Sequence, residues 1–175
     1  MSDPYYTFRP ESVALPAKTV TLFARPALGQ GRERLSSALL LSEWMQPAPD
    51  ARVLCLHCGS GLAGIAAALQ APAGQVTLVD SHVVAVEAAR RALEASGIAN
   101  ARALLGDCAE PVRGETFDNV VAHLPKGRAA WEQTILDASR ALKPGGTLHL
   151  AGANKAGIKT AAKFVKSVFG HVHVL

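Results

Sequence analysis

The chain has 175 residues, of which 49% are hydrophobic and 18% charged, so it is long enough for one domain with a buried core. No run of about 18 uncharged apolar residues occurs, which excludes a membrane-spanning helix, and the polar first residues do not read as a secretory signal. Three cysteines are few and odd in number for a disulfide scaffold, so we expect a cytoplasmic protein.

The net charge of +4 is concentrated near the end of the chain, because four lysines and no acidic residue follow residue 150. Lys155, Lys159, Lys163 and Lys166 recur every three or four residues and therefore share one face of a helix. Such a face suits an anionic partner, and RNA is the partner that we expect there. A solvated helix face without a partner is the alternative.

The first 30 residues are predicted as an extended lead-in with one strand at Thr19–Phe23, and residues 31–175 as a single domain. A helix is predicted at Arg32–Met45, because prolines follow it. From residue 51 onward, strands and helices alternate. The predicted strands are 51–58, 75–80, 101–107, 117–124, 147–153 and 171–175, and the predicted helices are 61–70, 81–97, 128–142 and 156–170.

The strands are apolar on both faces, which is typical of a mostly parallel sheet covered by helices on both sides. Right-handed crossovers then give a doubly wound α/β fold, whose ligands bind beyond the carboxyl ends of the strands. The candidate site is therefore sought where strands end.

The first such end carries the pattern G-x-G-x-x-G at Gly59, Gly61 and Gly64, between a strand and a helix, and Asp80 ends the next strand. Glycine permits a left-handed backbone and a close approach of ligand, and a helix N-terminus presents free amides. A carboxylate at Asp80 can accept hydrogen bonds from both hydroxyls of a ribose. The pattern fits a nicotinamide dinucleotide and S-adenosylmethionine equally well.

Three further motifs, "GD" (106–107), "FDNVV" (117–121) and "LKPGG" (142–146), resemble the series of the class I methyltransferases. "GSGLAGIAAA" and the preceding "LLLSEWM" resemble the "methyltransferase small" family, bacterial enzymes that methylate N2 of guanine in ribosomal RNA. The resemblance implies a Rossmann-like fold, S-adenosylmethionine as cofactor and ribosomal RNA as substrate. It implies a cofactor site made of Cys55, Gly59, Gly61, Asp80 and Asp107. It also implies a target site made of His123 and Lys126.

The chain departs from the family pattern in the first and fourth motifs. Cys55 stands where the family has an acid and His57 where it has a glycine. The fourth motif reads "AHLPKG", so that Pro125 alone is retained and Lys126 replaces the aromatic residue that stacks on the base. Family members are tandem proteins with a degenerate first half, which "LPKGRAAWEQTIL" and "AGANKAGIKTAAKFV" resemble. A degenerate domain that binds RNA or supports a catalytic partner therefore stays open, as does an NAD-dependent oxidoreductase.

Two other motifs are interpreted as structural. Cys55 and Cys58 form a C-x-x-C, but Cys55 lies within an apolar strand, so we expect buried cysteines and no metal site. The alternation of that strand predicts that Cys55 and His57 point the same way. "GANKAGIKT" (152–160) departs from a nucleotide-binding P-loop, because Ile158 separates its second glycine from the lysine.

The predicted last strand, 171–175, ends the chain without the seventh, antiparallel strand of the class I fold. An exposed strand edge invites a partner. We expect a second methyltransferase domain or a second copy of the chain to cover it.

Overall fold

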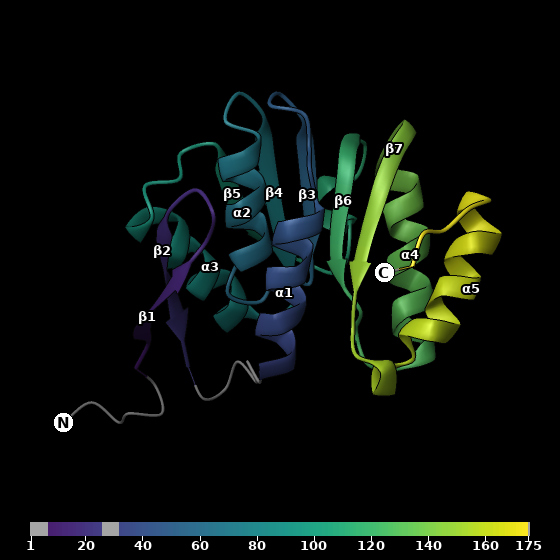
Figure 1. The fold of residues 1–175 in the computed structure, drawn as a ribbon, viewed down its shortest axis with the longest axis horizontal. Helices are drawn as coiled ribbons and strands as arrows, with labels where there is room; N and C mark the ends of the chain where they lie inside the picture. The colour runs from purple at the N-terminus through teal and green to yellow at the C-terminus, as the bar shows by residue number, and fades with distance from the viewer. Residues whose placement is uncertain (1–6, 26–31, 175) are drawn as a thin grey trace.

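The computed structural model describes residues 7–25 and 32–174 and consists of a central sheet between two layers of helices (Figure 1). The five strands of the sheet are all parallel and follow the order β5-β4-β3-β6-β7. They are β3 (Arg52–Leu56), β4 (Gln75–Asp80), β5 (Ala101–Leu105), β6 (Phe117–His123) and β7 (Leu142–Ala151). The predicted doubly wound, Rossmann-like α/β class is confirmed.

Three helices pack on one face of the sheet and two on the other. The first layer is α1 (Arg32–Trp44), α2 (Leu62–Gln70) and α3 (Val83–Ala95), and the second is α4 (Arg128–Ala141) and α5 (Ile158–Phe169), with short 3-10 turns at η3 (Glu110–Val112) and η4 (Asn154–Ala156). No helix within the described ranges is long and apolar enough to cross a membrane.

Strand β3 shows why the sheet needs both layers. Val53 and Cys55 pack into the core under α1–α3, whereas Leu54 and Leu56 pack into the core on the α4 side. Each of the four side chains is at most 2% exposed. A strand whose last four residues are all apolar therefore lies at the centre of the sheet, as its pattern predicts.

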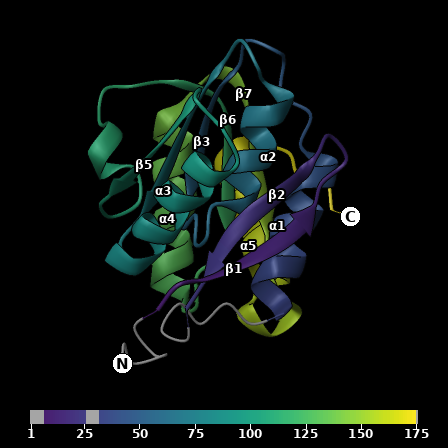
Figure 2. The same ribbon diagram turned by 90° about the vertical axis from the view of Figure 1, so that its left-hand side faces the viewer.

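The described part of the predicted lead-in is a folded hairpin. Strands β1 (Arg9–Ala14) and β2 (Thr19–Ala24) pair antiparallel, and Val20 and Leu22 are buried. Figure 2 shows the hairpin in front of the helical layer, where β2 packs on α3. The strand predicted at Thr19–Phe23 is confirmed as β2, whereas β1 was missed, because its side chains are mostly exposed and lack an apolar pattern.

The last predicted strand is also wrong, because residues 171–174 have no regular secondary structure. Strand β7 therefore has no neighbour on its outer side among the described residues. It also begins at Leu142 rather than at the predicted Thr147, with a register shift against β6 and a left-handed backbone at Gly145.

Candidate functional site

Three of the segments predicted to bind a cofactor lie side by side at one edge of the sheet. The register pairs Leu56 of β3 with Val79 of β4, and Asp80 with Leu105 of β5. The loop after β3, Asp80 at the end of β4 and Asp107 just after β5 are therefore neighbours. Backbone hydrogen bonds join them, from the Cys58 amide to the Val79 carbonyl and from the Gly106 amide to the Asp80 carbonyl, each at 3.1 Å.

Asp80 fixes the shape of the glycine loop. Its Oδ2 accepts a hydrogen bond from the Gly59 amide at 2.9 Å, and its Oδ1 accepts one from the His82 amide at 2.9 Å. The residue is only 6% exposed. Each carboxylate oxygen retains a second acceptor direction, so Asp80 can both hold the loop and accept a hydroxyl from a ligand.

The loop and the start of α2 depend on glycine at two positions for different reasons. Gly61 is the N-cap of α2, with φ +90°, and no side chain caps the helix there. The first amides of α2 therefore face the carboxyl ends of the strands, as the amides of a helix N-terminus do. Gly64 instead allows close packing, because a Cβ atom at this position would lie 2.5 Å from Leu78 Cδ2.

His57 adopts a left-handed backbone, with φ +53°, although it carries a side chain. Its Nε2 lies 2.9 Å from Oγ1 of Thr134 on α4, and Thr134 Oγ1 itself donates to the Ala130 carbonyl at 2.9 Å. A threonine hydroxyl has one proton, so Nε2 of His57 must donate. The ring thereby ties the loop after β3 to the helix layer of α4.

Cys108, next to Asp107, belongs to the same cluster. It also has a left-handed backbone, with φ +45°, and its Sγ lies 3.9 Å from both His57 Nε2 and Thr134 Oγ1. Positive φ at non-glycine residues costs free energy and is concentrated at functional sites. Thr134 was not singled out from the sequence, because nothing in its motif distinguishes it from the other residues on the buried face of α4.

The prediction that Cys55 and His57 point the same way is wrong. Cys55 packs under α1, whereas His57 reaches α4 on the opposite face of the sheet. The cause is that β3 ends at Leu56, so His57 already lies in the turn and no longer follows strand alternation.

Cys55 is a neutral thiol at physiological pH. Its side chain is 2% exposed, and burial, followed by the negative charge of Asp80, raises its pKa from 9.0 to about 12. It therefore brings no negative charge to the site, unlike an acid at this position. Within the described residues, no group of three or more His, Cys, Asp or Glu side chains has the arrangement of a metal site.

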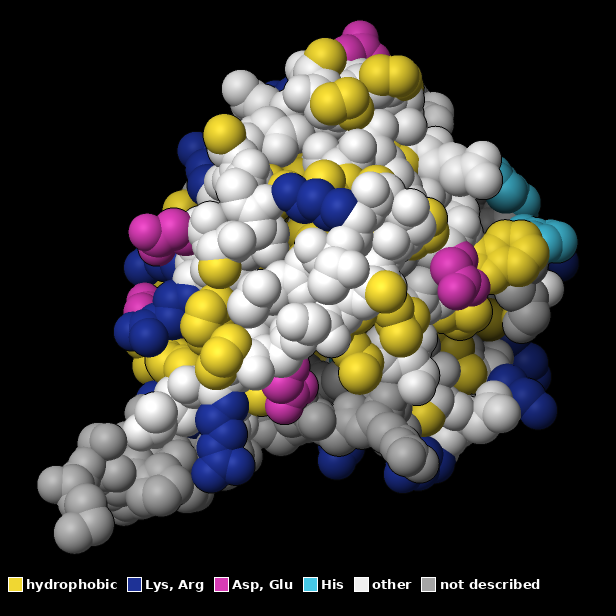
Figure 3. Space-filling model, turned by 60° about the vertical axis from the view of Figure 1, so that its left-hand side comes forward, with side chains coloured by type: hydrophobic (Ala, Val, Ile, Leu, Met, Phe, Trp, Pro, Cys, Tyr) yellow, Lys and Arg dark blue, Asp and Glu magenta, His cyan; other side chains and the backbone are white. Residues whose placement is uncertain are grey.

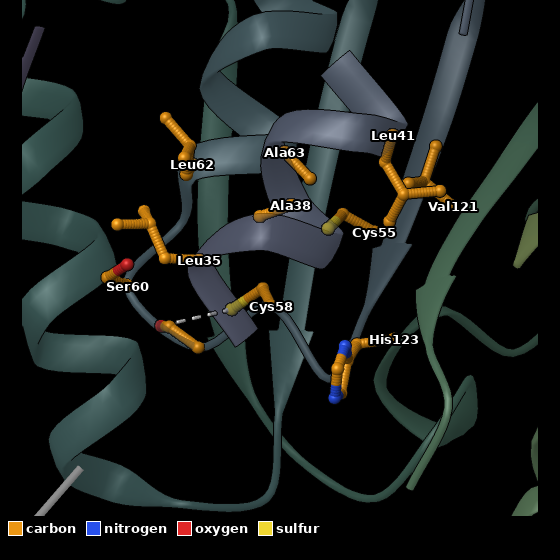
Figure 4. Close-up of a pocket in the computed structure, with 11 residues that line it drawn as sticks. Leu35, Ala38, Leu41, Cys55, Cys58, Ser60, Leu62, Ala63, Val121 and His123 are labelled. Carbon is orange, nitrogen blue, oxygen red and sulfur yellow. Dashed lines mark hydrogen bonds between the residues drawn. The ribbon is translucent and has the colours of Figure 1, made fainter. Parts of the chain in front are cut away.

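A narrow cavity of about 50 Å³ lies between α1 and the glycine loop (Figure 4). Cys55 and Cys58 line it together with His123, the last residue of β6. Its outer wall is formed by Leu35, Ala38 and Leu41 of α1, a helix to which the sequence assigned no role in the site. The structure thus brings His123 to the glycine loop, whereas Lys126 is exposed on the loop that follows β6.

The side chains and amides at this edge suit an adenosine-bearing cofactor in part. Acceptors at Asp80 and the exposed Asp107 match ribose hydroxyls and an adenine amino group, and the glycine loop leads into the first turn of α2, which no side chain caps. The neutral Cys55 thiol cannot attract an ammonium group by charge. The fit is therefore good at the adenosine end and weaker at the amino-acid end.

Comparison with known proteins identifies relatives of the chain. Residues 23–175 match the family profile "Methyltransferase small domain". "Ribosomal RNA large subunit methyltransferase G" of Shewanella amazonensis is 36% identical over 129 residues, which cover 68% of this chain and 33% of the relative. A ribosomal protein methyltransferase of Dechloromonas aromatica is 36% identical over 76% of this chain and 43% of its own length.

A solved structure shares the fold. A 16S rRNA guanine-N2 methyltransferase from T. thermophilus, in complex with AdoMet and guanosine, superposes with a TM-score of 0.79 at 21% identity and covers 93% of this chain and 46% of its own. The chain thus spans between a third and a half of the length of these relatives.

Proposed function

Because the chain belongs to the methyltransferase small domain family, we propose that it is an S-adenosylmethionine-dependent methyltransferase that modifies ribosomal RNA in the cytoplasm, at N2 of a guanine. The observation that carries this proposal is the adjacency of the glycine loop, Asp80 and Asp107 at the ends of three neighbouring strands. Relatives named as ribosomal RNA methyltransferases supply the substrate class.

The cofactor would bring an activated methyl group, and the chain would align it with the acceptor. The amides after Gly59 and Gly61 would hold its amino-acid end. Asp80 would accept hydrogen bonds from the ribose hydroxyls, and Asp107 would accept one from the adenine amino group. Cys55 would contact the same end of the cofactor as the glycine loop, through packing rather than charge.

His123 and Lys126 would act on the target nucleotide. A histidine ring in its neutral form has one nitrogen that accepts a hydrogen bond. Through such a nitrogen, His123 would accept a hydrogen bond from an N–H of the target amino group, which keeps the lone pair of that amino nitrogen directed at the methyl group. Lys126 is exposed close by in sequence and would pair with a phosphate. The exposed lysines Lys159, Lys163 and Lys166 of α5 would contact the RNA backbone. Lys155 would join them from η4, because it precedes the left-handed Gly157 and does not lie on the same helix as predicted.

A second candidate is a degenerate domain that binds RNA or supports a catalytic domain without methyl transfer. The specific observations that favour it are the neutral thiol of Cys55 and the His57 ring bound to Thr134. Both alter the loop that would hold the amino-acid end of the cofactor.

Calorimetry with S-adenosylhomocysteine and NAD, followed by transfer of radiolabelled methyl groups to ribosomal RNA, tests the proposal on the full chain. Micromolar binding of S-adenosylhomocysteine, weakened in Asp107→Ala, together with labelled guanine supports the enzyme. No binding of either compound supports the degenerate domain. Tight binding of NAD instead would revive the oxidoreductase alternative, and transfer to ribosomal protein instead of RNA would change the substrate class.

A further inference from the structure

Thr134 of α4 joins two loops of the candidate site. Its Oγ1 lies 2.9 Å from Nε2 of His57, in the loop after β3, and 3.9 Å from Sγ of Cys108, in the loop after β5. The loop after β3 continues into the glycine turn, and Cys108 follows Asp107 directly. One hydroxyl therefore contacts both of the loops to which the cofactor is assigned.

Every hydrogen-bonding capacity of this hydroxyl is used. A hydroxyl has one proton to donate and two lone pairs that accept. The proton of Thr134 goes to the Ala130 carbonyl at 2.9 Å, one lone pair accepts from His57 Nε2, and the other faces the Cys108 thiol. Burial raises the pKa of that thiol from 9.0 to about 11, so it keeps its proton at neutral pH and can donate weakly to the hydroxyl.

These contacts lie beneath the surface, where water competes little with them. Thr134 is 1% exposed and Cys108 is 7% exposed. On the face shown in Figure 3, in contrast, basic, acidic and hydrophobic side chains are interspersed, as is typical of a surface in contact with water. A hydrogen bond shielded from water is stronger than one at such a surface.

The backbone of both loops indicates that these contacts impose their geometry. His57 and Cys108 have left-handed φ angles of +53° and +45°. Such a conformation costs free energy at a residue with a side chain and persists only where the surroundings stabilise it. Among the residues that the structure describes, these are the two non-glycine residues with positive φ, and both contact Thr134.

Helix α4 connects this point to the target side of the site. The helix begins directly after Gly127, and the Trp131 amide donates to the Gly127 carbonyl at 3.2 Å. His123 and Lys126 lie just before Gly127, at the end of β6 and in the loop after it. Thr134 thus holds the cofactor loops against the helix that follows the proposed target-binding residues.

We propose that Thr134 is a positioning residue, whose hydroxyl holds the loops after β3 and β5 in the geometry that binds the cofactor. This inference rests on the proposed function and adds a residue outside the motifs that carry it. It also gives a role to His57, whose ring makes a tether that a glycine at this position could not make. The degenerate-domain candidate predicts the opposite, namely that the bond between His57 and Thr134 hinders the cofactor.

Two substitutions at Thr134 separate positioning from packing. Thr134→Val keeps the side-chain volume and loses the hydroxyl, whereas Thr134→Ser keeps the hydroxyl and loses a buried methyl group. Calorimetry on the full chain should give about fivefold weaker binding of S-adenosylhomocysteine for Thr134→Val and nearly unchanged binding for Thr134→Ser. Thermal melting should show that Thr134→Ser is nevertheless destabilised, and an affinity that follows Tm instead of the hydroxyl would overturn the proposal.

Ser139 provides a matched control on the same helix. Its hydroxyl donates to the Leu136 carbonyl at 2.7 Å, so Ser139→Ala removes a hydrogen bond within α4. The affinity for S-adenosylhomocysteine should not change in this variant. A loss equal to that of Thr134→Val would show that any weakening of α4 has the same effect, which would refute a specific role of Thr134.

A double-mutant cycle tests the partner of Thr134. His57→Gly suits the left-handed backbone and removes the ring, so it should weaken binding about as much as Thr134→Val does. The double variant should bind no more weakly than either single variant, because both remove the same bond. Losses that add up would overturn the proposal. Tighter binding in a single variant would overturn it too and would favour the degenerate-domain candidate.

Hydrogen exchange of the glycine loop distinguishes failure of this proposal from failure of the proposed function. The Gly59 and Gly61 amides are both hydrogen-bonded, to Asp80 Oδ2 and to the Cys58 carbonyl. They should exchange faster in Thr134→Val than in Thr134→Ser, with or without a cofactor. If this difference is seen but the unmodified chain binds no S-adenosylhomocysteine, the methyltransferase proposal alone fails. Equal exchange in the two variants would refute the positioning role.

Discussion

Replacement of Asp80 by alanine is expected to loosen the glycine loop and to destabilise the whole fold. The carboxylate accepts hydrogen bonds from the Gly59 and His82 amides at 2.9 Å each and is 6% exposed. A hydrogen bond to a charged group contributes about 1.5–3 kcal/mol. Because the two bonds share one carboxylate, we expect a loss of about 3 kcal/mol, which for a chain of this size lowers Tm by about 6–12 °C.

Denaturant unfolding and thermal melting of Asp80→Ala measure this loss, and calorimetry with S-adenosylhomocysteine measures the loss of affinity. Asp80→Asn retains one acceptor oxygen, so its stability and its affinity should lie between those of Asp80→Ala and those of the unmodified chain. Asp107→Ala is the matched control, because Asp107 is exposed and its loss should weaken ligand binding while changing the free energy of unfolding by less than about 0.5 kcal/mol. If Asp80→Ala has the same Tm as the unmodified chain, the carboxylate does not hold the loop.

Three further predictions concern the same edge of the sheet. Gly64→Ala should destabilise the chain by about 2 kcal/mol in denaturant unfolding, since overpacking against Leu78 outweighs the gain in helix propensity; an unchanged midpoint would contradict the 2.5 Å contact. His57→Ala should be about 1 kcal/mol less stable than His57→Gly, because only alanine keeps the strain of a left-handed backbone, and the reverse order would show that the backbone relaxes. Burial raises the pKa of Cys55 to about 12, so between pH 9 and 12 the unfolded chain loses this proton first and stability falls with rising pH. Alkaline unfolding should be shallower in Cys55→Ala, and equal slopes would contradict a buried thiol.

The architecture could be predicted because it depends on local patterns. A run of consecutive apolar residues such as Val53 to Leu56 of β3 is buried on both faces of its sheet, and the helices between the strands carry apolar residues at helical spacing. The carboxyl ends of parallel strands meet at one edge of the sheet, so Gly59, Asp80 and Asp107 could be placed together from the sequence alone.

Prediction from the sequence failed for elements whose secondary structure depends on contacts with residues far away in the chain. Within the ranges 7–25 and 32–174, strand β1 is mostly exposed and pairs only with β2. The segment 171–174 alternates like a strand yet pairs with no strand in those ranges. An alternating pattern shows that a segment can form a strand, but hydrogen-bonding partners determine whether it does.

By itself, the sequence determined the parallel sheet, its two helical layers and the strand ends at which a ligand would bind, because apolar periodicity acts through neighbours in the chain. Only the tertiary structure decided that Asp80 is bound to the loop amides, that His57 turns away from Cys55 to Thr134, and that Thr134 also contacts Cys108 in the loop after β5. These features join residues up to 77 positions apart. Their contacts arise from packing, which no local pattern encodes.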